Sequence, residues 1–216
     1  GELTGWDDPS LVTIAALRRR GFLPEAIKNF VLSTGISKSE STLEWEDFII
    51  HNKRLLDKTA KRFFFIKSPE KIIIEGAPSR EIELNLHPEE GRGGRNFSVG
   101  SEFYVEKDDF EKFEEGGIYR LMDCLNFEMK NGKFIFHSLE YEKYKQTGAR
   151  IMHWLPVSEK LINVEILHPD KSISEGLAEE NLKIIGKGDI IQFERFGFCR
   201  YDSDVGEKKL FYFTHK

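Results

Sequence analysis

The sequence predicts an α+β protein, with a helical N-terminal part followed by a longer part built from short strands. Apolar residues recur at helical spacing over residues 1–62. After that point they alternate with polar residues, as in half-buried strands. Asn131-Gly132 separates two strand-like segments and is a strong signal for a type I′ hairpin turn. Many short antiparallel strands with frequent turns are typical of barrels or sandwiches.

The first helix is expected to begin at Pro9, which suits the first helical position. Asp7 or Asp8 precedes it, and capping explains these carboxylates better than a catalytic pair does. Gly21 is expected to end the helix in the left-handed conformation. Cations complement the helix dipole in the last turn, which holds Arg18, Arg19 and Arg20.

Two further helices are expected before the strands begin. The second opens at Pro24 and runs to Gly35. The third follows a capping box at Ser41-Thr42-Leu43-Glu44 and ends near Lys61.

The remaining elements are expected to be strands, apart from a glycine-rich loop at 87–94 and a short helix or loop at 107–117. In the strand that starts at Arg80, Ile82, Leu84 and Leu86 alternate with polar residues. The other expected strands cover residues 63–66, 71–75, 102–106, 118–129, 133–139, 150–155, 162–167, 189–198 and 209–214.

Composition excludes several classes of protein. The net charge of the 216 residues is −5, which disfavours bulk non-specific nucleic-acid binding but leaves room for a local basic groove. Cys124 and Cys199 lie too far apart to predict a zinc site or a disulfide framework, and they fit a reducing, cytosolic compartment. No apolar stretch approaches the ~20 residues of a membrane span, and no signal peptide is visible.

The sequence shows no convincing catalytic constellation. It contains neither a His-x-Gly-His phosphate-binding motif nor a Gly-x-Gly-x-x-Gly loop. The six histidines are scattered, and His153, beside Trp154 in an expected strand, is predicted to be packed. We therefore expect this chain to lack an activation site and to act by recognition.

Residues 5–27 contain a long and specific order of residues. Gly-Trp-Asp-Asp-Pro is followed by a short apolar stretch, by Leu-Arg-Arg-Arg-Gly and by Pro-Glu-Ala-Ile. This order resembles one place in the class I glutamyl- and glutaminyl-tRNA synthetases of archaeal and eukaryotic form. There it follows the ATP-binding Lys-Met-Ser-Lys-Ser-type loop and begins a helical domain along the inner side of the tRNA. Ser10 and Val12 depart mildly from the family's Arg and Pro. Ile36-Ser37-Lys38-Ser39 comes too late in the chain to be that loop, so a helix connection is expected there.

The resemblance covers nearly the whole chain. It continues at residues 52–57 (Asn-Lys-Arg-Leu-Leu-Asp), 60–62, 87–88, 116–121, 152–156 (Met-His-Trp-Leu-Pro) and 192–195 (Gln-Phe-Glu-Arg). It implies a helical domain over residues 1–62, which contacts the inner corner of the tRNA, and an anticodon-binding region over 63–216. That region would hold two interleaved antiparallel β-barrels, a proximal one at about 63–76 plus 162–216 and a distal one at about 77–161.

The resemblance also implies which residues read the anticodon. Arg62 and Gln192 fall at positions that converge on the middle base, a uridine, whose edge offers two carbonyl acceptors and one N–H. Arg195 would hold a phosphate or the neighbouring base, and Arg120 would contact the first base. Lys112 stands where a glutaminyl-type enzyme has an arginine for the third base, and a lysine is a point donor where arginine is a fork.

The chain is thus expected to be the C-terminal, tRNA-binding part of an archaeal-type glutamyl-tRNA synthetase in the cytoplasm. Arg18, Arg19 and Arg20 would join the barrels in a basic tRNA-binding surface. This part would carry no cofactor, while the full enzyme, with its N-terminal catalytic domain, would use ATP and Mg²⁺. Its partner would be glutamate tRNA and possibly glutamine tRNA. A glutaminyl-tRNA synthetase fragment is one alternative. A stand-alone tRNA-binding module is another, although the absence of an initiator Met weighs against it.

Overall fold

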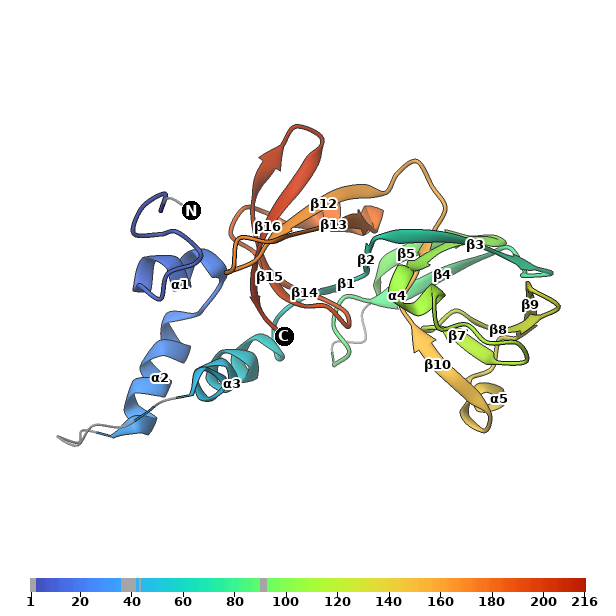
Figure 1. The fold of residues 1–216 in the computed structure, drawn as a ribbon, viewed down its shortest axis with the longest axis horizontal. Helices are drawn as coiled ribbons and strands as arrows, with labels where there is room; N and C mark the ends of the chain where they lie inside the picture. The colour runs from blue at the N-terminus through green and yellow to red at the C-terminus, as the bar shows by residue number, and fades with distance from the viewer. Residues whose placement is uncertain (1–2, 36–41, 43, 90–92) are drawn as a thin grey trace. The chain divides into compact units, whose positions relative to one another are not determined.

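The structure is a computed structural model that describes residues 3–35, 42, 44–89 and 93–216 (Figure 1). Its helices lie mostly near the N-terminus, and its strands form a nearly closed barrel-shaped sheet and a second sheet, which confirms the predicted α+β class. The chain divides into two compact units. Unit 1 comprises Gly1–Lys61, Glu165–Ser174 and Ile185–Lys216, and unit 2 comprises Arg62–Val164 and Glu175–Ile184.

Helix α1 of unit 1 spans Ile14–Arg20, so its predicted start at Pro9 is wrong. The helix is capped by Thr13, whose hydroxyl oxygen accepts from the backbone N–H of Ala16 at 3.1 Å. Asp8 is not the cap because its carboxylate is used in a tight local turn, where it accepts from the backbone N–H and the hydroxyl of Ser10. These hydrogen bonds hold the pKa of Asp8 well below its usual range. Gly21 ends the helix at φ 103°, as predicted.

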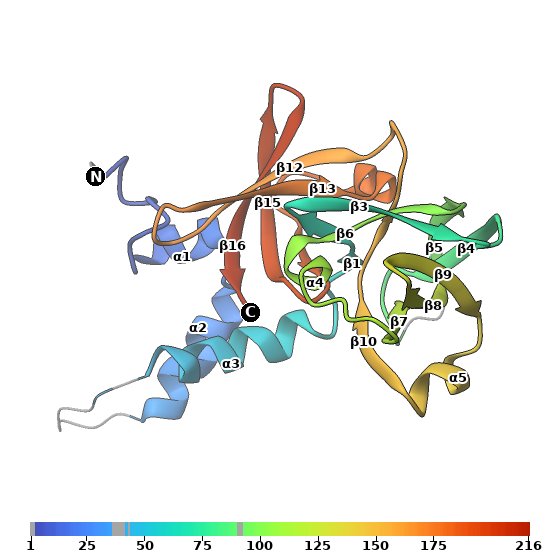
Figure 2. The ribbon, with the colours of Figure 1, turned by 45° about the vertical axis from the view of Figure 1, so that its right-hand side comes forward.

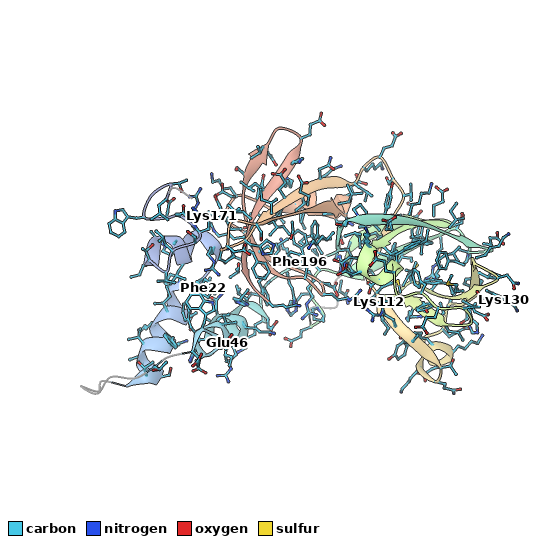
Figure 3. The ribbon with its side chains drawn as sticks, in the orientation of Figure 1. Phe22, Glu46, Lys112, Lys130, Lys171 and Phe196 are labelled. Carbon is cyan, nitrogen blue, oxygen red and sulfur yellow. The ribbon has the colours of Figure 1, made fainter. Side chains whose placement is uncertain are left out.

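Helices α2 (Pro24–Thr34) and α3 (Trp45–Leu56) pack side by side (Figure 2). The predicted second helix is confirmed, while the third ends at Leu56, earlier than the predicted Lys61. Phe22 lies at the corner between α1 and α2 (Figure 3). Its ring stacks on that of Phe48, with ring centroids 4.7 Å apart. The expected capping box lies partly, and the 36–39 connection wholly, outside the described residues.

The sheet of unit 1 is built around the antiparallel strands β14 (Ile190–Phe193), β15 (Gly197–Val205) and β16 (Lys208–His215). The unit 1 residues of β12 (Ile162–Leu167) lie beside β16, and those of β13 (Ile173–Ala178) lie beside β12. The single strand expected at 189–198 is divided into β14 and β15, because the chain turns at Arg195, whose φ is 65°.

Unit 2 contains a sheet in the order β10-β7-β8-β9-β3-β6-β11. Two of its pairings are parallel, β3 with β9 and β10 with β7. The predicted hairpin turn between β8 and β9 is confirmed, with positive φ at Asn131 and Gly132. The strands of this sheet are β3 (Pro69–Glu75), β6 (Glu102–Glu106), β7 (Ile118–Leu121), β8 (Leu125–Lys130), β9 (Lys133–Ser138), β10 (Gly148–Met152) and β11 (Leu155–Pro156).

The other elements of unit 2 complete its core. Strands β4 (Arg80–Asn85) and β5 (Gly94–Val99) form an antiparallel hairpin, and β2 (Phe65–Lys67) pairs with the end of β13. Strand β1 (Arg62–Phe63), helices α4 (Lys107–Phe110) and α5 (Tyr141–Lys145), and a 3-10 turn at Glu180–Ile184 make up the rest. The fully buried Trp154 lies at the centre of the core, with aromatic rings from Phe64, Phe97 and Phe103 around it. Among the described residues, no helix combines the length and apolar composition that crossing a membrane requires.

A buried histidine in unit 1 makes its stability sensitive to mild acid. The amide nitrogen of Asn52 donates to Nε2 of His215 at 3.0 Å, so Nε2 must be unprotonated. Burial lowers the pKa of His215 to about 4, against roughly 6.5 in an unfolded chain. The unfolded state therefore binds a proton first as the pH falls, and stability is lost from about pH 6.5 downward until the folded pKa is passed.

We expect the free energy of unfolding of unit 1 to fall by about 2 kcal/mol between pH 7 and pH 5 because of His215. Urea denaturation at a series of pH values measures this loss. A His215→Gln variant, which has no group that titrates there, should show a correspondingly flatter profile. Identical pH dependence in the variant and the wild type would contradict the assignment.

Candidate functional site

A basic pocket of about 510 Å³ lies in unit 1 between α1 and the sheet. Four cationic and two acidic side chains line it, so positive charge is in excess. Arg19 forms an ion pair with Asp7 at 2.9 Å, and its guanidinium lies 4.8 Å from the ring centroid of Tyr212. Arg200 donates to the carbonyl oxygen of Arg19 and so joins β15 to the end of α1. The residues lining this basic pocket are Asp7, Ala15, Arg18, Arg19, Lys187, Arg200 and Asp202.

Arg20, the third arginine of α1, lies elsewhere. It is 5 % exposed, and its guanidinium donates to the backbone carbonyls of Thr214 at 3.0 Å and Phe213 at 3.4 Å. Burial lowers the pKa of Arg20 to about 10. The structure thus separates the three arginines, since Arg18 and Arg19 line the pocket whereas Arg20 anchors α1 to β16. A contact of Arg20 with RNA stays a prediction.

Arg62 opens unit 2, and its side chain carries a buried donor. Its backbone N–H donates to the carbonyl oxygen of Leu86 at 2.7 Å, which fixes the start of β1. Its side-chain Nε is buried and has no hydrogen-bond partner among the described residues. Leaving such a group unpaired costs about 1–3 kcal/mol. The residue as a whole is only half-buried, so other parts of its side chain remain accessible.

Gln192 and Arg195 lie at the β14–β15 hairpin of unit 1. Gln192 is half-buried on β14, and its backbone N–H donates to the carbonyl oxygen of Lys61 at 2.9 Å. Arg195 is exposed in the turn that follows, and its positive φ takes the backbone out of the extended conformation there. Arg62 belongs to the other unit, so the predicted meeting of its side chain with that of Gln192 stays a prediction.

Lys112 and Arg120 differ in exposure within unit 2. Lys112 is exposed in the segment after α4. It lies away from Lys130, which is at the β8–β9 turn (Figure 3). Arg120 on β7 is only 7 % exposed. Its Nη1 donates to the side-chain oxygen of Asn126 at 2.8 Å and to the carbonyl oxygen of Leu139 at 3.2 Å. The exposed Lys112 side chain can thus adjust its conformation to a ligand, whereas the Arg120 side chain is held in place by its hydrogen bonds.

One cluster of unit 2 has the residue types of a metal site. Ligand atoms of Glu106, Asp109 and His153 lie within 4.8 Å of one another. Asp109 already accepts from Arg150 at 2.9 Å, and His153 is joined through Nε2 to the carbonyl oxygen of Phe65 at 2.7 Å. His153 is buried, as predicted. Because a cation already neutralises Asp109, we interpret the cluster as an internal network that joins α4 to the neighbouring strands.

Comparisons with known proteins decide the family. Residues 60–142 and 151–202 each match a family model described as the anticodon-binding domain of class I tRNA synthetases (E and Q). Residues 1–58 match the model of the catalytic domain of the same synthetases. The chain belongs to the class I glutamyl- and glutaminyl-tRNA synthetase family. It is similar to the glutamate–tRNA ligases of Pyrococcus abyssi, at 39 % identity over 226 residues, and Methanocaldococcus jannaschii, at 38 % over 221 residues.

Both alignments cover 100 % of this chain and 39 % of the relative, so the chain spans about two fifths of the length of these relatives. Within this synthetase family member, the expected base-reading positions all fall inside the anticodon-binding matches. Sequence reasoning missed Lys187 and Arg200 in the basic pocket. No local signal marks them, because the pocket joins segments that are far apart in the chain.

Proposed function

We propose that this chain is the tRNA-binding part of an archaeal-type glutamate–tRNA ligase. The observation that carries the proposal is the buried, unpaired Nε donor of Arg62, which lies in a segment that matches an anticodon-binding model. The whole enzyme would join glutamate to tRNA with ATP and Mg²⁺. The glutamate–tRNA ligases that resemble this chain along its full length support glutamate as the amino acid.

The proposed division of labour follows the order of the chain. Residues 1–62 would dock along the inner corner of the tRNA. Residues 63–76 with 162–216 would form a proximal barrel and residues 77–161 a distal barrel, and both would grip the anticodon. In that arrangement Lys112 and Arg195 would contact the bases or phosphates around the middle base, and Arg120 would take part in binding the first base.

The middle anticodon base, a uridine, would be read by Arg62 and Gln192 together. The half-buried Arg62 side chain would turn so that its unpaired Nε donor meets a carbonyl oxygen of the base. The Gln192 amide carries both a donor and an acceptor, so it would satisfy the remaining carbonyl and the N–H of the uridine edge. An unpaired buried donor costs free energy in the unbound protein, and binding would recover that cost.

The basic pocket would hold a phosphate of the tRNA backbone. Its four cations outnumber its two carboxylates, in a protein whose net charge is −5. Asp7 is already paired with Arg19, which leaves Arg18 and Lys187 as the cations best placed for an added anion. Phosphate contacts position a nucleic acid without reading its sequence.

Salt titration tests this role of the pocket. We expect the wild-type chain to bind glutamate tRNA with an affinity that falls steeply between 50 and 200 mM salt. Arg18→Ala and Lys187→Ala should each weaken binding and reduce the slope of log affinity against log salt by about 1, because each variant removes one phosphate contact. Filter binding or fluorescence anisotropy measures both quantities.

Lys130→Ala is the matched control, since it removes an exposed lysine at the β8–β9 turn and should leave the slope unchanged. Wild-type affinity that is flat with salt, or equal for unrelated tRNAs, would contradict the proposed function. If wild-type affinity falls steeply with salt but both pocket variants keep the wild-type slope, only the proposed phosphate binding by the pocket would be contradicted.

A further inference from the structure

An exposed tyrosine of unit 2 is held over a buried arginine. Tyr141, the first residue of α5, is 46 % exposed. The guanidinium carbon of Arg120 lies 5.4 Å from its ring centroid, within the range of a cation–π contact. Arg120 cannot move away easily because Nη1 is bonded to Asn126 and Leu139. The Tyr141 ring therefore lies against a fixed cation while the residue stays nearly half exposed to solvent.

The support beneath Tyr141 is itself rigid. Asn126 is fully buried, and its amide nitrogen donates to the hydroxyl of Ser138 at 2.9 Å and to the carbonyl oxygen of Glu140 at 2.7 Å. These bonds tie β8 to the end of β9 and to the residue before α5. Helix α5 lies against β7 and β8, and it stays beside β10 in both views (Figures 1 and 2).

Tyr144, three residues further along α5, lies on the same face of the helix as Tyr141 and completes the support. It is buried, and its ring centroid lies 6.1 Å from that of Tyr141. Gly148 at the start of β10 packs so closely on it that an added Cβ would approach the Tyr144 ring to 2.0 Å. Tyr141 is thus an exposed aromatic ring whose position is set by Arg120, Asn126 and Tyr144 before any ligand arrives.

We propose that Tyr141 is a stacking platform for an unpaired nucleobase of the bound RNA, with Arg120 as its positioning residue. Unpaired bases in RNA are bound by stacking on aromatic rings, and a ring fixed in advance loses little side-chain entropy on binding. The positive charge of Arg120 directly behind the ring also favours the anionic nucleotide. Tyr141 lies inside the match to an anticodon-binding model, so the inference rests on the proposed function and assigns it a base-binding residue.

A fluorescent base identifies the stacked position. Glutamate tRNA is prepared with 2-aminopurine at each unpaired anticodon-loop position in turn and titrated with the wild-type chain. At one position the fluorescence should be quenched on binding, because stacking on an aromatic ring quenches this base. Tyr141→Phe should keep the quenching and the affinity, since it keeps the ring. Tyr141→Leu should lose the quenching and bind about 5- to 150-fold more weakly.

Arg120→Met tests the positioning role. It should reduce both quenching and affinity when Tyr141 is present, and should add little in the Tyr141→Leu background, because the two residues act through one contact. Thermal unfolding of each variant checks that Tyr141→Leu and Tyr141→Phe remain as stable as the wild type, as expected for an exposed position.

The outcomes separate the two proposals. Wild-type tRNA binding with unchanged quenching and affinity in Tyr141→Leu would overturn the platform and leave the proposed function in place. Equal losses in Tyr141→Phe and Tyr141→Leu would also overturn it, since the hydroxyl rather than the ring would then matter. If the wild-type chain binds no tRNA, the proposed function and the platform both fail.

Discussion

Replacing Glu179 with alanine is expected to lower the free energy of unfolding of unit 2 by about 3–5 kcal/mol. Glu179 and Arg95 form a buried ion pair, with side chains 1 % and 2 % exposed and a closest distance of 2.7 Å. The same carboxylate accepts from the backbone N–H of Phe64 at 2.7 Å. Its removal would take the Glu179 carboxylate away from the buried Arg95 guanidinium, which lies 4.4 Å from the Phe64 ring centroid.

Chemical denaturation followed by Trp154 fluorescence measures this loss. The other two tryptophans, Trp6 and Trp45, lie in unit 1 and are replaced by phenylalanine beforehand, so that the signal reports unit 2. Glu75→Ala is the matched control. Its ion pair with Lys133 has the same 2.7 Å distance but is exposed, so the expected cost is about 0–1 kcal/mol.

Replacing both members of the buried pair separates the charge from the packing. A double variant, Arg95→Met with Glu179→Leu, should recover much of the stability lost in Glu179→Ala, because it leaves no unpaired buried charge. If Glu179→Ala costs no more than Glu75→Ala, the ion pair does not hold β5 against the loop after β13.

Replacing Arg62 with alanine is expected to weaken the binding of glutamate tRNA by about 1–3 kcal/mol, the scale of a lost paired base contact. The reason is the buried Nε donor of Arg62, for which the base supplies an acceptor in our proposal. The same change should not lower the stability of the free protein, because a buried donor without a partner is a cost to the fold. Measuring both tRNA affinity and denaturation of the Arg62→Ala variant thus distinguishes a loss of binding from a loss of stability.

The expected loss is specific to the middle anticodon base. A tRNA altered at that base should bind the wild type weakly, and Arg62→Ala should weaken that binding little further. The effects of an acceptor-stem change and of Arg62→Ala on affinity should instead add. Gln192→Ala should show the same pattern, and the double variant should lose less than the sum of the two single variants. Arg62→Ala binding every tRNA as the wild type does would remove the anticodon role of Arg62.

Local signals predicted the parts of the fold that depend on one or two residues. Gly21 ends α1 and Asn131-Gly132 forms a hairpin because few other residues adopt positive φ at so small a cost. The start of α1 was not predictable in the same way. Asp8 and Thr13 are both good caps, and only the turn that occupies the Asp8 carboxylate decides between them.

Strand β5 was missed for a reason that the buried ion pair explains. Arg95, Phe97 and Val99 share the buried face of this strand, so a charge interrupts the apolar alternation. The charge is tolerated there because Glu179, far away in sequence, neutralises it. The parallel pairings of β3 with β9 and β7 with β10 likewise depend on long-range contacts that leave no local pattern.

In the candidate site too, the sequence indicated some features, while others depend on the packing of distant residues. The resemblance to a family pointed to Arg62 and Gln192, but the unpaired Nε of Arg62 is a property of packing that no sequence pattern shows. Arg18, Arg19 and Arg20 look alike in sequence, and only the fold separates the pocket-lining pair from the buried anchor. Tyr141 has no distinguishing local signal, because its proposed role depends on Arg120 from strand β7.

The most direct test of the account is the affinity of the wild-type chain for glutamate tRNA and for the same tRNA changed only at the middle anticodon base. Both are measured by anisotropy at one salt concentration, so that phosphate contacts contribute equally. We predict that the altered tRNA binds about 5- to 150-fold more weakly, because the proposed contacts of Arg62 and Gln192 to the base are lost. Equal affinity for the two tRNAs would contradict anticodon recognition by this chain.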